Sequence, residues 1–293
     1  MKIPCPSGLV FEARKWKIGD IAELIGERER FASSLPLKMA ELACISTIEQ
    51  GPYKFTDKVD FSQVSLPDIA VANILLRVGS NPLLRLQPAC EGCRRPLRDA
   101  IEIDLSEMPV FMASKEGAEH LRTNAPVQRQ YGVHKVALKA VRGSDFKTLA
   151  KLQDEEPTYI LEYQHVLHIA QVSGGELKAP LVNVPDIRAW YHEQDISLRA
   201  EIDDDIDELW GGVDQSFTFR CDHLGCGLEQ SPEVPLDLAF YGLDQGKKQH
   251  RRSRRSSAKR SAGELMGTLS ATSSSSTPKS PASTSEESKK STS

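Results

Sequence analysis

The sequence predicts an α+β protein with a disordered C-terminal tail. Apolar residues recur at helical spacing in some segments and alternate with polar residues in others, and no aromatic residue follows Tyr241. The chain has 293 residues, of which 39% are hydrophobic, and this allows one or two domains with a sizeable core. It contains no run near the ~18 apolar residues of a membrane helix and no apolar signal-peptide centre. We therefore expect a soluble protein of a reducing compartment, with no membrane partner.

The first part of the chain, residues 1–82, is interpreted as an N-terminal strand and helical region. Several prolines and Gly8 predict a turn that leads into a short strand. Apolar residues at helical spacing then predict one helix from residue 19, a second over 36–50 and a third from Ser65 onward.

The second part, residues 83–143, holds the first cysteine pair among β-strands. Its clearest strand alternates apolar and polar side chains, as a half-buried strand does. The polar stretch 113–131 is expected to be a loop. Strands are predicted over 83–87, 100–105, 108–111 and 134–139.

The third part, residues 144–212, is predicted to be a helical insertion whose apolar face includes Ile169. The fourth part, residues 213–243, holds the second cysteine pair. That pair lies between a predicted strand over 215–220 and a closing edge strand over 233–238. The two cysteine pairs would thus belong to one β unit that the helical insertion splits.

The tail, residues 244–293, differs from the body in charge. It holds eleven Lys/Arg and four Asp/Glu, a net charge of +7, which leaves −11 for the body within the total of −4. Its fifteen serines and lack of aromatics cannot offset the entropy of ordering, so we predict disorder. The basic run 247–260 has no interleaved aromatics, so any nucleic-acid binding through it would be non-specific. A solubilising or regulatory role is the favoured interpretation.

Four of the six cysteines form two short pairs, Cys90/Cys93 and Cys221/Cys226. Each pair follows one predicted strand and precedes another, so the same strand, knuckle and strand unit occurs twice. Zn²⁺ prefers four soft or borderline ligands in a tetrahedron, and a Cys-x-x-Cys turn places two thiolates on one edge of it. The pattern therefore predicts a zinc-ribbon-like β unit with a structural zinc ion held by these four cysteines.

Some features of this pattern leave alternatives open. The second pair has the wider C-x4-C spacing, and His223 could replace one of its cysteines as a ligand. Four free thiols are the main alternative to a zinc site, and disulfides are disfavoured in a reducing compartment. Gly92 and Gly225 suit the tight turns of such knuckles. The remaining cysteines, Cys5 and Cys44, are expected to be bystanders, with Cys44 packed in the core.

The sequence contains none of the common enzyme motifs from which a catalytic residue could be assigned. The chain lacks the glycine-rich phosphate and dinucleotide loops, HExxH and GxSxG, so it is not expected to be an enzyme. Glu162 and His165, with His168 nearby, have the spacing of a di-iron ligand pair, but the second pair that such a site needs is missing. The acidic residues over 201–208 lack the pattern of a calcium loop. The first group is interpreted as a half-exposed helical face, and the acidic group as a solvated helix face.

The opening Ile3-Pro4-Cys5-Pro6-Ser7-Gly8-Leu9, followed by a Lys/Gly/Glu-rich helix, resembles the T4-type phage baseplate hub assembly proteins (hub assembly chaperones) of tailed phages and prophages. The resemblance extends through both cysteine knuckles to the exit Pro235-Leu236-Asp237-Leu238 and covers about residues 1–240. The C-x4-C spacing departs from the tighter second knuckle of that family, and the insertion and the tail carry no matching feature.

The resemblance implies a non-enzymatic, chaperone-like assembly factor for the baseplate hub of a contractile phage or prophage-derived tail. Its partners would be baseplate hub and other tail proteins, in the cytoplasm of the bacterial host. Two rival functions remain. One is a zinc-ribbon nucleic-acid-binding protein that uses the basic tail, which the acidic body disfavours. The other is a zinc enzyme, which would need an open coordination position at the metal.

Overall fold

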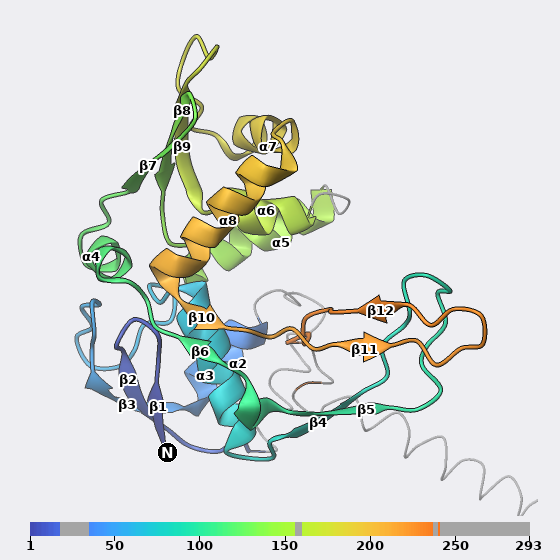
Figure 1. Cartoon of the computed structure of the whole chain (residues 1–293). Coiled ribbons are helices and arrows are strands. Elements are labelled where there is room, and N and C mark those ends of the chain that lie inside the picture. Colours follow the sequence, from blue (N-terminus) through green and yellow to red (C-terminus); the bar gives the residue numbers. More distant parts are fainter. Residues whose placement is uncertain (18–34, 156–159, 237–239, 241–293) are drawn as a thin grey trace, which may run out of the picture. The chain divides into compact units, whose positions relative to one another are not determined.

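The computed structural model describes residues 1–17, 35–155, 160–236 and 240. These residues belong to one unit that spans Met1–Asp244. They combine helices with antiparallel strand pairs, which confirms the α+β class (Figure 1). The helix predicted from residue 19 and the tail over 244–293 lie outside the described residues.

The N-terminal sheet has the strand order β1-β2-β3, and the predicted turn and short strand at the start of the chain are part of it. Gly8, with a φ of +88°, allows the turn between the first two strands, where the amide of Cys5 donates to the carbonyl of Leu9. The three strands are β1 (Lys2–Pro4), β2 (Val10–Ala13) and β3 (Cys44–Glu49).

The helix predicted over 36–50 is correct only in its first part. α2 (Leu35–Ala43) ends where β3 begins, and β3 pairs antiparallel with β2. Residues 45–48 include three β-branched side chains, which favour a strand once a partner strand is available. Cys44 therefore lies on a strand and not on a helix, but it is buried, as its expected packing role requires.

The third predicted helix is confirmed as α3 (Leu66–Val78). The side chain of Ser65 caps its first turn by accepting a hydrogen bond from the amide of Asp68, and Gly79 follows its last turn. The carboxylate of Asp68 is fully buried and accepts hydrogen bonds from Ser7 and Tyr53. These bonds attach the N-terminal turn to α3.

The stretch 113–131 is not the loop that its polarity predicts. It forms α4 (Lys115–Thr123) and β7 (Val127–Tyr131). Ser114 caps α4, and the helix packs through a narrow buried face. Its sequence therefore shows only a weak pattern of apolar residues at helical spacing. β7 pairs with β8 (His134–Leu138), the strand predicted over 134–139, and this second sheet has the order β7-β8-β9.

The segment 144–212 is mainly helical, with one strand that the helical spacing around Ile169 did not predict. β9 (Ile169–Gly174) pairs antiparallel with β8 and completes the second sheet. The helices are α5 (Phe146–Glu155), α6 (Ile160–Val166), α7 (Val184–His192) and α8 (Ile196–Trp210), and short 3-10 turns η2 (Leu105–Glu107) and η3 (Gly143–Asp145) occur earlier in the chain.

Three two-stranded ladders complete the described part of the fold. The strands predicted over 83–87, 100–105 and 108–111 are confirmed, whereas the strand over 215–220 is reduced to its last two residues. In place of the closing strand over 233–238, Glu233 makes a single bridge to Ser216, and 237–239 lie outside the described residues. The ladders are β4 (Leu83–Leu86) with β5 (Ile101–Asp104), β6 (Val110–Phe111) with β10 (Gly212–Val213), and β11 (Phe219–Arg220) with β12 (Glu229–Gln230).

Two buried clusters hold these elements together. The larger one joins the N-terminal sheet, α3, the second sheet, α7 and α8, and contains Phe11, Tyr191 and Trp210. The smaller one connects α2 and α3 to the strands that lead into the cysteine loops. Its buried members are Met39, Ile74, Leu84, Leu105, Val234 and Phe240.

Within the described ranges, none of the helices combines the length and the apolar character needed to cross a membrane.

Candidate metal centre

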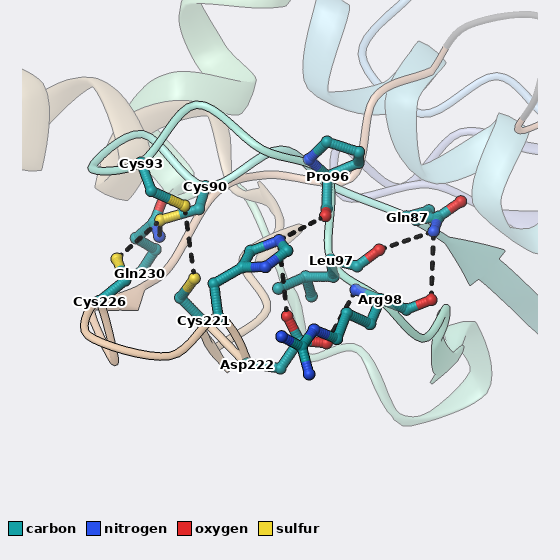
Figure 2. Close-up of polar contacts among 11 residues, drawn as sticks. Gln87, Cys90, Cys93, Pro96, Leu97, Arg98, Cys221, Asp222, Cys226 and Gln230 are labelled. Carbon is teal, nitrogen blue, oxygen red and sulfur yellow. Dashed lines mark hydrogen bonds and ion pairs between the residues drawn. The ribbon is translucent and has the colours of Figure 1, made fainter.

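Two loops carry the four cysteines, and each loop joins the strands of one antiparallel ladder. Cys90 and Cys93 lie between β4 and β5, and Cys221 and Cys226 lie between β11 and β12 (Figure 1). We call these two ladders and their loops the ribbon. Figure 2 shows the sulfur atoms of the two loops gathered together, and all four lie within 4.8 Å of one another. The fold therefore brings together all four residues that the spacing singled out.

The distances between sulfur atoms test whether a metal ion fits. Sγ of Cys90 lies 3.6 Å from Sγ of Cys226, and Sγ of Cys93 lies 3.7 Å from Sγ of Cys221. With a Zn–S bond of about 2.3 Å, the edge of a regular tetrahedron is about 3.8 Å. A disulfide would require about 2.05 Å, and the cysteines are free thiols. Two of the sulfur–sulfur distances are thus close to the tetrahedral edge, and the four sulfurs, all within 4.8 Å of one another, could hold a metal ion.

The two loops share a backbone pattern despite their different cysteine spacing. In each, the amide of the first cysteine donates to the carbonyl two residues after the second cysteine: Cys90 to Arg95 at 2.9 Å, and Cys221 to Leu228 at 2.8 Å. In each, the residue directly after the second cysteine has a positive φ, 56° at Arg94 and 63° at Gly227. The unit of strand, knuckle and strand that occurs twice in the sequence therefore has the same local backbone structure both times.

The glycines of the two knuckles have different roles. Gly225 has a φ of +83° and open space around it, so its backbone conformation requires glycine. Gly92 does not have a positive φ. A Cβ there would lie 3.0 Å from Cδ2 of Leu228 and 3.5 Å from Sγ of Cys226, so glycine gives the facing loop room to approach.

His223 lies outside the sulfur cluster. Its Nε2 is 2.8 Å from the carbonyl oxygen of Pro96, which can only accept, so this nitrogen carries the proton. The neighbouring carboxylate of Asp222 accepts from the backbone amide of Arg98 at 2.8 Å. The alternative in which His223 replaces a cysteine ligand is therefore disfavoured, and the side chain instead connects the second knuckle to the first.

One supporting residue could not be predicted from the spacing. Nε2 of Gln230 donates to Sγ of Cys90 at 3.1 Å, and Oε1 of the same amide accepts from the backbone of Glu91 at 2.9 Å. Such bonds orient a ligand and stabilise a thiolate. Gln230 is 140 residues from Cys90, so no local pattern could indicate the contact.

The electrostatics of the cluster favour a bound cation. The backbone amide of Cys93 lowers the pKa of Cys90 to about 6, although burial opposes the shift. At Cys221 the amide of His223 also favours the thiolate, but burial and the three neighbouring sulfurs raise the pKa to about 12. Four thiolates this close repel one another, and a divalent cation among them removes that penalty.

The other candidates from the sequence form no metal site. His165 Nδ1 lies 2.9 Å from Oδ1 of Asp203, whereas Glu162 Oε1 pairs with Nδ1 of His192 at 2.7 Å. His168 is buried beside β8. Among the described residues, the four cysteines are the one cluster of three or more potential ligands.

The acidic segment over 201–208 is less solvated than predicted. Asp203 accepts from the hydroxyl of Tyr191, and Asp205 accepts from the hydroxyl of Tyr131. These carboxylates attach α8 to α7 and β7. Cys5 and Cys44 are both buried away from the cluster, in the bystander role that their isolation predicts.

Comparison with known proteins gives no relative at a significant level: no protein-family model, no curated protein and no solved structure matches the chain.

Proposed function

We propose that the protein is a non-enzymatic assembly factor whose cysteine centre binds one structural Zn²⁺. The observation that carries this proposal is the set of four sulfurs at near-tetrahedral spacing. A tetrahedral zinc with four cysteine ligands has no open position for water or substrate, and this is the signature of a structural site. Tetrahedral sulfur sites also accept iron, so zinc is the specific claim under test.

The position of the centre supports a structural role for the metal. Cys93 and Cys221 lie 128 residues apart in the sequence, and the ion would join the two loops in addition to the hydrogen bonds between them. The second loop exposes two apolar side chains, with Leu224 93% exposed and Leu228 44% exposed. A metal in this place would supply the rigidity that a hydrophobic core provides elsewhere.

For the biological role, we propose assembly of the baseplate hub of a contractile phage or prophage-derived tail, with hub and tail proteins as partners. The support is the resemblance of the opening residues and of both knuckles. The opening residues build the anchor of the N-terminal sheet: Sγ of Cys5 contacts the carbonyl of Asp68, and Ser7 binds its carboxylate. The residues that carry the resemblance therefore have structural roles. Such a resemblance is consistent with a common fold and does not require a common catalytic site.

Two measurements test the proposal. Full-length protein expressed with zinc supplied should contain about one equivalent of zinc, and less than roughly half an equivalent would contradict the site. When expressed together with the tail proteins encoded beside it, the protein should co-purify with a hub protein. Neighbouring genes unrelated to tails, or failure to retain any hub protein, would contradict the assembly role while leaving the zinc site standing.

Nucleic-acid binding is a second candidate, and one observation favours it. Arg94, Arg95 and Arg98 are all exposed on the first knuckle, beside the metal centre. Arginines on such a loop can neutralise phosphates. This function predicts binding of duplex DNA or RNA that falls steeply with salt and weakens when the three arginines become glutamines. The net charge of −11 on residues 1–243 weighs against it.

A further inference from the structure

A groove separate from the cysteine centre lies where α8 ends. It has a volume of about 640 Å³ and is formed by the C-terminal end of α8, the β6–β10 ladder and the segment around Glu233. Figure 1 shows β6 and β10 next to the end of α8. Phe111 and Met112 line the groove and are 56% and 65% exposed. Large apolar side chains with this exposure, grouped in a hollow, mark a binding surface.

The charged residues that line the groove are all acidic. Asp207, Glu208, Asp214 and Glu233 line it, and its lining includes no Lys or Arg. The nearby imidazole of His165 is paired with Asp203. A groove lined by both carboxylates and exposed apolar side chains fits a ligand that is cationic and also carries an apolar side chain.

The acidic side chains occupy an unfavourable place on their helix. The C-terminus of a helix has partial negative charge, which favours basic residues, yet the last turn of α8 has none and instead carries Asp207 and Glu208. Burial, followed by the charge of Asp203, also raises the pKa of Asp207. The charge of His165 acts on Asp207 in the opposite direction, and a cation bound in the groove would relieve the repulsion further.

We propose that this groove binds a cationic segment of a partner protein, with one aromatic or large aliphatic side chain seated against Phe111 and Met112. The proposal goes beyond the assembly role and depends on neither the metal nor the hub. The acidic lining disfavours nucleic acid. The basic run 247–260 of the chain itself has the charge, but Ala258 is its sole apolar residue, so it lacks an anchor.

Fluorescence anisotropy with two labelled synthetic peptides tests the proposal on the full chain. The first peptide has lysines on both sides of a central Trp-Leu pair, and the second has the sequence of 247–260. The first should bind saturably and at least ~10-fold more tightly than the second, because only it carries an apolar anchor. Its affinity should also fall as salt rises.

Variants locate the binding site. Phe111→Ser and, separately, Met112→Ser should each weaken the first peptide ~10-fold, and Glu208→Lys should reduce both its affinity and its salt dependence. The matched controls are Val133→Ser, at an apolar residue 68% exposed elsewhere, and Glu176→Lys, and both should leave binding unchanged.

Three results would overturn the proposal. They are no saturable binding of the first peptide, equal affinity for both peptides, and equal loss of affinity in the groove variants and the controls. Equal affinity would assign the groove to charge alone and make the chain's own tail its natural occupant.

Discussion

Replacing Cys221 by serine should release the metal and lower the free energy of unfolding of the whole described unit. The hydroxyl of serine is a poor zinc ligand, and the three remaining thiols would keep an incomplete site. The smaller buried cluster contains both body and ribbon residues, such as Ile74 of α3 and Val234 after β12, so the effect should reach the body.

The magnitude follows from the length of the chain segment that the metal closes. Cys93 and Cys221 are 128 residues apart, and their sulfurs are 3.7 Å from each other. A cross-link over a loop of that length lowers the entropy of the unfolded chain enough to contribute about 5 kcal/mol. For a domain of this size, that loss corresponds to a fall of about 10–20 °C in the melting temperature.

Denaturant unfolding followed by tryptophan fluorescence measures the effect, because Trp190 and Trp210 are buried in the body. Cys44→Ser is the matched control, since it removes a buried thiol outside the centre and should keep the full metal content. If Cys221→Ser retained its zinc, or unfolded at the same denaturant concentration as the parent, the reasoning about the centre would be wrong. Chelation of the parent protein should reproduce the loss.

Three further changes test the body. A hydrogen bond with Asp203 raises the pKa of His165, so the free energy of unfolding should fall as pH rises from about 6.5 through the raised native pKa, and Asp203→Asn should flatten this dependence in urea titrations. Burial lowers the pKa of His168 to about 3, so the free energy of unfolding should fall as pH falls from about 6.5 towards 3. His168→Gln should remove this fall. If the variant kept the same dependence of the free energy of unfolding on pH, the buried ring of His168 would not be its cause. Gly117→Ala should destabilise the protein by about 1–3 kcal/mol, because the new Cβ would clash with the carbonyl of Leu209 on α8. At a solvent-exposed helix position the same change raises thermal stability, so a higher melting temperature would refute this packing.

The cysteine centre could be predicted from the sequence because its signal is local. Each cysteine pair lies between short strands and has a spacing of a few residues, although the two pairs that come together are more than 120 residues apart in the sequence. The support from Gln230 and the contact of His223 with Pro96 could not be predicted, because these contacts form between segments more than 120 residues apart. Local sequence patterns point to candidate ligands, whereas the residues that contact these ligands depend on the complete fold.

The errors in the predicted secondary structure have a common physical cause. The apolar residues over 44–49 fit helical spacing as well as strand spacing, and pairing with β2 decides between the two. The same competition turns Ile169 into the start of β9, because β8 offers a free edge. In α4 the opposite problem occurs: Gly117 and His120 face the core, and neither carries an apolar signal.

The proposed metal would act where the ribbon has little secondary structure of its own. β11 and β12 pair over two residues each, and an isolated two-stranded ladder of that length is marginal in water. At its base the ribbon shares a hydrophobic cluster with α2 and α3, but at its tip Leu224 is almost fully exposed. The base can therefore be held by burial of apolar area, whereas hydrogen bonds such as that between His223 and Pro96 join the two loops nearer the tip. In the proposed site a cation among the four cysteines would add to the stability of the tip, and because the base belongs to the same cluster as α3, stability lost at the tip would also be lost to the body.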